Sequence, residues 1–315
     1  LYPGKEHCGR VYLRDVGIEN YGICAETAFT YEKEEAKNLL PQRKTSGHKG
    51  TFGKVLVLAG SCAMCGAAVL CARAVLASGA GMVKVVTEER NRTPLFCALP
   101  EAMADFWKED EPLPEEALLQ DLAWADAVVA GPGLSKSRTA KELLVFTVQH
   151  TEVPLVLDAD ALNLIAEDAE ILSGCRAEKI LTPHVGELAR LLHMTIAECQ
   201  RDPAESAGRA AEKYQACCVR KDSVTVTAEE GREQYYINTS GSSALATAGS
   251  GDVLAGITGA FAAKRQCEKN EKKISLAKTA ALAAYAHGKA GEAAEEKSSA
   301  SYVTASEIIR GLQSI

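Results

Sequence analysis

The sequence predicts an α/β protein with a largely parallel central sheet that helices cover on both faces. Short segments rich in Val, Leu and Ile alternate along the chain with segments of helical periodicity. This alternation is typical of parallel strands that are buried on both faces and joined by crossover helices. Because 47% of the 315 residues are apolar, the chain can bury the core of one large α/β domain with an appendage.

The expected elements follow one another in a regular order. The strands predicted for the parallel part of the sheet are Lys54–Ala59, Met82–Thr87, Ala127–Ala130, Pro154–Asp158 and Lys179–Thr182. The helical patterns between them are Gly66–Ser78, Lys136–Gln149 and Ala161–Glu167. Three closely spaced strands joined by turns come next, at Ala216–Arg220, Val224–Thr227 and Gln234–Ile237. Helices are predicted from near Gly251 and over the Ala-rich region Leu276–Ala294.

Charge and composition exclude several classes of protein. A net charge of −7 argues against nucleic-acid and membrane-surface partners. No apolar run reaches the roughly 18 residues of a membrane-spanning helix, and no signal peptide is recognisable. The eleven cysteines form no disulfide framework, which fits a reducing cytoplasm. Cys62-Ala-Met-Cys65 is compatible with a redox or metal motif, but packing in a loop and helix is favoured.

The most informative segment is Asn238–Asp252, in which small residues lead into a helix that carries a carboxylate at its start. The first amides of a helix have no intrahelical partners and attract anions. Gly249 and Gly251 allow a phosphate to approach the backbone. We therefore expect a phosphate site with Asp252 in reach of a bound hydroxyl. The alternative is a glycine-rich turn in which Asp252 is an ordinary first-turn acid.

Polar and glycine-containing segments follow several of the predicted strands, at the sheet edge where open α/β proteins bind ligands. They are Gly60-Ser61, Gly131–Leu134, Asp158–Asn163 and Thr182–Glu187. The last three have structural alternatives: a tight turn for Gly131–Leu134, helix caps for Asp158 and Asp160, and a surface cap for His184. No dinucleotide fingerprint follows a strand, and no P-loop is present.

Seven ordered segments together resemble the ADP- or ATP-dependent NAD(P)H-hydrate dehydratases, a family of metabolite-repair enzymes with a ribokinase-like three-layer αβα sandwich. They are His48–Ser61, Gly66–Ala68, Ala98–Met103, Gly131–Leu134, Asp158–Asn163, Thr182–Glu187 and Asn238–Asp252. The start of the chain, Tyr2–Gly4 and Gly9–Ile18, resembles the last strand of the NAD(P)H-hydrate epimerase domain. We therefore expect an epimerase remnant plus linker at residues 1–40 and the dehydratase domain at residues 41–315.

The resemblance implies a role for each matching residue. Asp252 would be the catalytic base and would contact the substrate together with Gly66, Ala67, Gly133 and His184. The adenine nucleotide would be bound by Lys221, Asp222, Ser223, Val224 and Thr225 and by Gly249, Ser250 and Gly251. Mg²⁺ would arrive with the nucleotide phosphates rather than in a metal site of the protein. ADP is the expected phosphoryl donor, and a cytoplasmic homo-oligomer, a tetramer, is the expected assembly.

The sequence departs from the family pattern at a few positions, and two other functions stay open. Asp222 stands where Gly is usual, Arg220 replaces an apolar residue, Ser242-Ser243 replaces Asn-Gly and Ala248 replaces Gly. A carboxylate beside a nucleotide phosphate would repel it, unless Asp222 points to solvent or marks an altered nucleotide preference. One alternative function is a small-molecule kinase of the same fold, acting for example on a vitamin alcohol. The other is a nucleotide-binding module without catalysis.

Overall fold

The computed structural model describes residues 7, 8, 12, 14, 17, 28–40, 45–231, 234–268, 273–298 and 302–315. Most of Tyr2–Ile18, the segment that resembles an epimerase strand, lies outside the described residues. Within the described ranges, no helix is both long and apolar enough to cross a membrane.

Within the described part of the chain, ten strands form a single sheet that is largely parallel, as predicted. In chain order they are β1 Ala28–Phe29, β2 Lys54–Leu58, β3 Met82–Glu88, β4 Met103–Trp107, β5 Ala127–Ala130, β6 Leu155–Leu157, β7 Lys179–Leu181, β8 Cys217–Arg220, β9 Val226–Glu229 and β10 Tyr235–Ile237. The spatial order is β1-β10-β9-β8-β7-β6-β5-β2-β3-β4. Among these strands, β9 alone runs antiparallel to its neighbours. β1 extends the sheet beside β10, so residues of the region before position 40 pack onto the domain.

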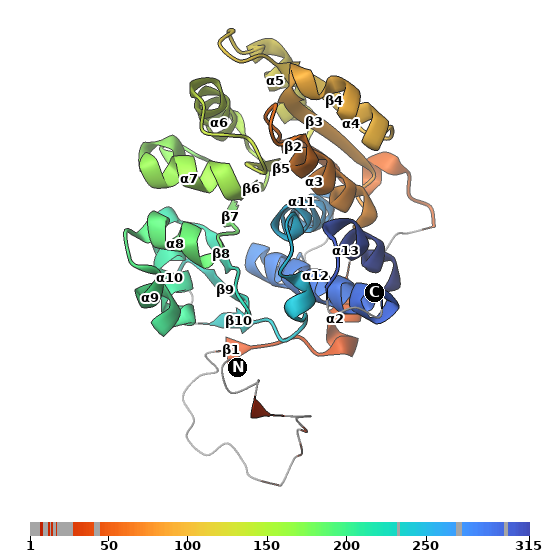
Figure 1. The fold of residues 1–315 in the computed structure, drawn as a ribbon, viewed down its shortest axis with the longest axis vertical. Helices are drawn as coiled ribbons and strands as arrows, with labels where there is room; N and C mark the ends of the chain where they lie inside the picture. The colour runs from red at the N-terminus through yellow and green to blue at the C-terminus, as the bar shows by residue number, and fades with distance from the viewer. Residues whose placement is uncertain are drawn as a thin grey trace.

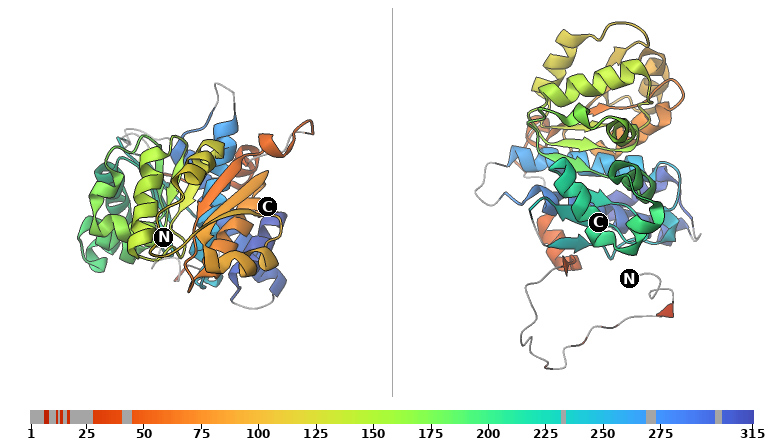
Figure 2. Two further views of the ribbon diagram at one scale, coloured as in Figure 1. Left: turned by 90° about the horizontal axis from the view of Figure 1, so that it is seen from above. Right: turned by 90° about the vertical axis from the view of Figure 1, so that its left-hand side faces the viewer.

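Helices cover both faces of the sheet and make a three-layer sandwich (Figures 1 and 2). They are α2 Lys33–Leu39, α3 Cys65–Ala77, α4 Arg92–Ala98, α5 Glu115–Trp124, α6 Arg138–His150, α7 Ala159–Glu167, α8 Val185–Leu192, α9 Ile196–Arg201, α10 Pro203–Tyr214, α11 Ser250–Cys267, α12 Leu276–Ser298 and α13 Ala305–Gly311. Alternate residues of β2 divide between the two cores: Val55 and Val57 face α3 and α11, whereas Leu56 and Leu58 face α5 and α6.

Helix α11 occupies the centre of one layer, where it packs on the sheet between α3 and α12 (Figure 1). Its residues Val253, Ala255, Ile257 and Ala262 are completely buried. Burial along most of its length anchors the helix, so its first turn is held in a defined place at the carboxyl ends of β5 and β6. This anchoring fixes the position of Asp252.

Several boundaries differ from the prediction. The strand expected at Val224–Thr227 is β9, which begins two residues later at Val226. Val224 and Thr225 instead belong to the β8–β9 loop, where the Thr225 carbonyl accepts a hydrogen bond from the Asn238 backbone. Helix α6 begins at Arg138 rather than at Lys136, because the Ser137 side chain caps it by accepting from the Ala140 amide.

Candidate active site

The candidate site lies where the parallel strands end and α11 begins. Gly249 occupies the N-cap position of α11 with φ +84°, a left-handed conformation that suits glycine. A Cβ on Gly249 would lie 2.6 Å from Cδ1 of Leu70 in α3 and 3.8 Å from Oδ2 of Asp252. The start of α11 is thus packed closely against α3, and the Asp252 carboxylate lies beside it.

A lysine and an aspartate from different strand ends meet at this helix start. Nζ of Lys221, just after β8, donates to Oδ1 of Asp158, just after β6, over 2.7 Å. Oγ1 of Thr182 donates to the same oxygen over 2.8 Å. A Cβ built on Gly251 would lie 3.3 Å from Lys221 Nζ. The ammonium group therefore adjoins the first amides of α11, and both carry positive charge toward the same place.

The pKa of Asp252 is raised to about 7, first by burial and then by the negative charge of Asp158, while Lys221 opposes the shift. A carboxylate with this pKa takes up and releases a proton near neutral pH. Such a group is suited to general base catalysis. Burial acts to lower the pKa of Lys221, but the attraction of Asp158 and other acids outweighs it and raises that pKa, so the ammonium group stays charged.

Asp158 and Asp160 do more than begin the following helix. Asp158 stands at the N-cap position of α7 but makes no side-chain capping bond. Its carboxylate instead holds Lys221 and Thr182, which argues against the simple cap. The Asp160 carboxylate accepts a hydrogen bond from the backbone amide of Ser135 over 2.8 Å and so stabilises the loop after β5.

The residues expected to contact the substrate form two groups at this edge. Gly133 lies against the start of α3, since its Cβ would be 2.9 Å from that of Ala67. Gly66 is exposed beside Ala67, with open space where a Cβ would stand. His184 caps α8 by accepting from the Gly186 amide, which agrees with the cap alternative. Its backbone also pairs with that of Lys221, so His184 lies beside the charged cluster.

The segment expected to bind the nucleotide is the loop of the β8–β9 hairpin. Lys221 is fixed at its start by a backbone hydrogen bond to the Pro183 carbonyl. The carboxylate of Asp222 accepts from the Arg220 guanidinium over 3.1 Å and from the Ser223 amide over 2.8 Å. Asp222 is therefore part of an ion pair within the protein.

His287, which was not predicted to belong to the site, reaches the start of α11 from α12. Its Nε2 lies 3.1 Å from the hydroxyl oxygen of Ser250. Burial, reinforced by the charge of Lys221, lowers the pKa of His287 to about 4, so the ring is neutral at neutral pH. The one available signal was a histidine interrupting the buried apolar run of α12 that ends at Ala286.

The Cys62–Cys65 segment makes the turn into α3, and both thiols are free. Burial raises the pKa of Cys65, which disfavours the reactive thiolate. In the part of the chain that the structure describes, no three His, Cys, Asp or Glu side chains gather as a metal site would require. Cys62 is exposed and Cys65 is half-buried, so the packing role expected for the two cysteines stays a prediction.

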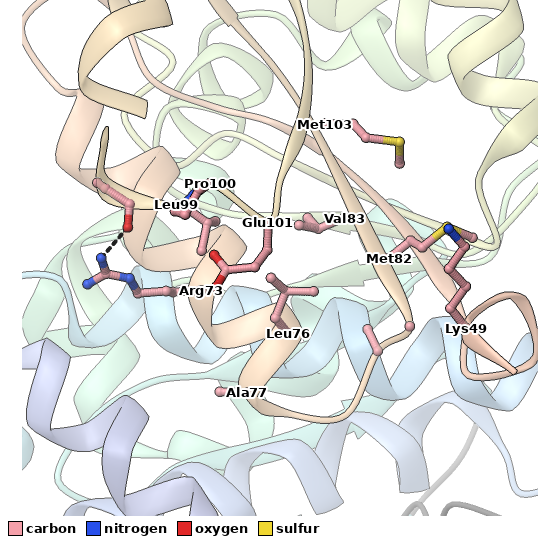
Figure 3. A pocket seen from close by; sticks show the side chains of 13 residues that line it. Lys49, Arg73, Leu76, Ala77, Met82, Val83, Leu99, Pro100, Glu101 and Met103 are labelled. Atoms are coloured by element: carbon pink, nitrogen blue, oxygen red, sulfur yellow. Dashed lines mark hydrogen bonds between the residues drawn. The ribbon is translucent and has the colours of Figure 1, made fainter. Parts of the chain in front are cut away.

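A cavity of ≈ 740 Å³ lies away from this site, between the C-terminal part of α3 and the starts of β3 and β4 (Figure 3). Leu76, Met82, Leu99 and Met103 give it apolar walls. None of the residues expected to bind substrate or nucleotide lines it. It opens at the amino ends of the strands, so it is separate from the charged cluster at their carboxyl ends.

Fold and site together place the chain in the ribokinase-like class of α/β proteins, as similarity to solved structures shows. An Enterococcus faecalis protein described as ribokinase-like superposes with a TM-score of 0.78 at 27% identity, covering 94% of this chain and 97% of that one. A family model described as NAD(P)H-hydrate dehydratase matches residues 55–314. The chain belongs to the NAD(P)H-hydrate dehydratase family.

The names of similar proteins agree with this family assignment. A bifunctional NAD(P)H-hydrate repair enzyme of Moorella thermoacetica is 36% identical over 304 residues, which are 93% of this chain and 55% of the relative. An ADP-dependent (S)-NAD(P)H-hydrate dehydratase of Neisseria meningitidis is 37% identical, over 81% of each chain. The ADP/ATP-dependent dehydratase of Bacillus subtilis, co-crystallized with ATP/Mg²⁺, gives a TM-score of 0.71 at 30% identity, covering 89% and 95% of the two chains. The chain spans 55% to 58% of the length of the bifunctional relatives it matches first.

Proposed function

We propose that this chain dehydrates hydrated NADH and NADPH, at the expense of a nucleotide phosphoryl group, and so restores the reduced cofactors. The observation that carries the proposal is the carboxylate of Asp252 at the start of α11, because its pKa, raised to about 7, suits a general base. Membership of the dehydratase family supports this function over a kinase of the same fold. A dehydratase of this kind needs a base beside a phosphate site, and the position of Asp252 in the first turn of α11 supports that role.

In the proposed reaction, the terminal phosphoryl group of the nucleotide passes to the hydroxyl oxygen of the hydrated ring. Asp252 accepts the hydroxyl proton as that O–P bond forms and the bond to the nucleotide breaks. Phosphate then leaves with the C–O bonding electrons, and loss of a proton from the adjacent carbon restores the ring double bond. Phosphorylation is useful because phosphate is a far better leaving group than hydroxide.

The protein's share of this chemistry is positioning and charge. The amides of Gly249, Ser250 and Gly251 would bind the transferring phosphoryl group, with Lys221 beside them. Gly66, Ala67, Gly133 and His184 would place the hydrated nicotinamide so that its hydroxyl meets Asp252. Carboxylates such as Asp158 and Asp252 are ligands of the type that Mg²⁺ prefers, so a nucleotide-bound Mg²⁺ fits here and would neutralise phosphate charge.

We predict that ADP is the phosphoryl donor. The donor named for the Neisseria relative supports this choice, whereas the name of the Bacillus relative includes both ADP and ATP. Initial rates with hydrated NADH should be measured over a concentration series of each nucleotide with Mg²⁺. Turnover with ATP and none with ADP would reverse the assignment.

Replacing Lys221 by alanine should weaken nucleotide binding more than it slows the reaction. A hydrogen-bonded charge beside a phosphate contributes enough that the apparent nucleotide KM should rise roughly 10- to 100-fold. Because Lys221 lowers the pKa of Asp252, the variant's activity should also rise at a higher pH than that of the wild type. A complete nucleotide titration at several pH values measures both effects. An unchanged KM would indicate a lysine that serves the fold alone.

We also propose a cytoplasmic homotetramer. The free thiols of the described cysteines are consistent with a reducing compartment. Alanines such as Ala281 and Ala286 of the Ala-rich helix α12 are buried within the chain, so they do not supply a surface for assembly. Light scattering at micromolar concentration should give a mass near four times 33.5 kDa. A mass near 33.5 kDa would show a monomer.

A further inference from the structure

The β8–β9 hairpin contains an arginine that is buried among apolar side chains, where an uncharged residue would be expected. The side chain of Arg220 is 1% exposed, at the last position of β8, where it pairs in register with Val226. It lies on the same face of the strand as Cys218, within the small apolar cluster formed with α8, α9 and α10. An arginine in such surroundings is costly unless a counter-ion and hydrogen bonds compensate its charge.

Asp222 provides that compensation from two residues further on. Its Oδ2 accepts from Nη2 of Arg220 over 3.1 Å, while its Oδ1 accepts from the Ser223 amide over 2.8 Å. Nε of Arg220 is buried without a hydrogen-bond partner. Compensation of the buried guanidinium charge therefore depends strongly on the single carboxylate of Asp222. The two charges cancel locally, which removes the repulsion that an isolated Asp222 would exert on a phosphate.

The pair also determines where the intervening residue points. The hydrogen bond between Arg220 and Asp222 keeps these two side chains on one side of the chain, whereas Lys221 follows Arg220 at the end of β8 and takes the other side. On that other side, Lys221 meets Asp158 and adjoins Gly251. An ion pair on the opposite side of the chain would restrict the backbone of Lys221 and so keep its ammonium group at the start of α11.

We propose that Arg220 and Asp222 act as one positioning pair for the nucleotide-binding loop, and that nucleotide affinity depends on the intact pair rather than on either charge. This inference rests on the proposed function, because it takes the loop Lys221–Thr225 to be the nucleotide site. Asp222 thus serves Arg220 and the loop, and it is not a repulsive acid facing the ligand.

The test is a double-mutant cycle with Asp222→Ala, Arg220→Met and the double variant. Methionine fills the apolar space without charge. Glu230→Ala is the matched control, since Glu230 is an exposed acid at the far end of β9 and its loss changes net charge equally. For each protein, the measurements are the Tm without ligand, the Kd of ADP by calorimetry and kcat at saturating ADP.

We expect Asp222→Ala to lower the Tm by roughly 5–10 °C, because it leaves Arg220 buried and uncompensated. It should also weaken ADP binding about tenfold or more with little change in kcat, as loss of a charged hydrogen bond in the binding loop would do. The double variant should recover most of the Tm, because no uncompensated charge stays buried. Its ADP affinity should stay about as low as that of Asp222→Ala, because the pair is absent, and Glu230→Ala should resemble the wild type. A purely structural pair would shift the Tm and leave the Kd unchanged.

Besides an unchanged Kd, three outcomes would overturn the proposal. ADP binding that tightens in Asp222→Ala would show a repulsive acid instead of a positioning one. Losses of ADP affinity that add up in the double variant would show that the two residues act separately and not as a unit. Lack of ADP binding by the wild type would remove the proposed nucleotide site as well. By contrast, ADP binding without dehydration would contradict only the proposed function and leave the cycle valid.

Discussion

Replacing Asp252 by asparagine should lower kcat by roughly 10²- to 10⁴-fold, the usual contribution of a positioned general base. Asparagine keeps the size of the side chain but cannot accept the hydroxyl proton. Nucleotide binding should survive, because the amides at the start of α11 belong to the backbone. It should even tighten, since a negative charge beside the phosphate is lost. Single-turnover rates and ADP affinity measured on one preparation would establish this pattern.

The same substitution should stabilise the protein at and above neutral pH. The folded-state pKa of Asp252, about 7, lies above the ordinary value of 3.8. The folded protein therefore holds a proton that the unfolded chain releases, and this stability is lost as pH rises from about 4 through 7. Asparagine does not ionise, so the Tm of the variant relative to wild type should increase from about pH 4 to 7 and stay higher above pH 7.

The pH profile gives an independent check on Asp252. Wild-type kcat/KM should rise with pH through an apparent pKa near 7, because only the deprotonated carboxylate acts as a base. This step should be absent from the residual activity of Asp252→Asn. A variant that folds, binds ADP and turns over at nearly the wild-type rate would remove Asp252 from the mechanism and make it an ordinary helix acid.

The second large effect is expected at Gly131, just after β5. Its φ is +123°, and a Cβ there would lie 1.8 Å from the carbonyl oxygen of Asp158. A backbone atom cannot swing aside, so Gly131→Ala combines conformational strain with overpacking, at a cost of roughly 2–6 kcal/mol of folding free energy. The clash would displace Asp158 and, through it, Lys221. Activity should therefore fall further than the loss of folded protein explains.

Gly174→Ala is the matched control for this variant. Gly174 also has a positive φ, +74°, but no atom lies within 4 Å of the position that a Cβ would take there. Its replacement should cost only the conformational strain, roughly 1–2 kcal/mol, and leave kcat/KM unchanged. Chemical denaturation and steady-state rates should be compared for the two variants. Equal effects would show that the contact between Gly131 and Asp158 does not position the site.

Local pattern was sufficient to predict most of the sheet. Strands such as Ala127–Ala130 are apolar throughout, and the structure places this one with the predicted bounds. The edge strand β4, Met103–Trp107, was not predicted as a strand, because its exposed Met103 and polar Asp105 break the buried pattern. The three strands near the end of the sheet were recognised, but the turn that starts β9 depends on a hydrogen bond from Asn238, which local sequence cannot supply.

The candidate site was predicted in outline and completed by long-range contacts. The carboxyl ends of parallel strands share an edge, so the sequence could indicate that the segments containing Asp158 and His184 meet. It could not indicate that Lys221 bonds to Asp158, 63 positions away, or that His287 reaches Ser250, 37 positions away. The pairing of Arg220 with Asp222 was also hidden, because each residue looked like a separate departure from the family pattern.

The most direct test of the proposed activity is to incubate the purified chain with hydrated NADH, ADP and Mg²⁺ and to follow the absorbance of the reduced nicotinamide ring. We expect a rise that depends on ADP, with one AMP and one phosphate formed for each NADH restored and almost none in Asp252→Asn. Consumption of nucleotide that yields a stable phosphate ester without NADH would show a kinase. Binding of ADP with neither product would show a module without catalysis and would contradict the proposed function.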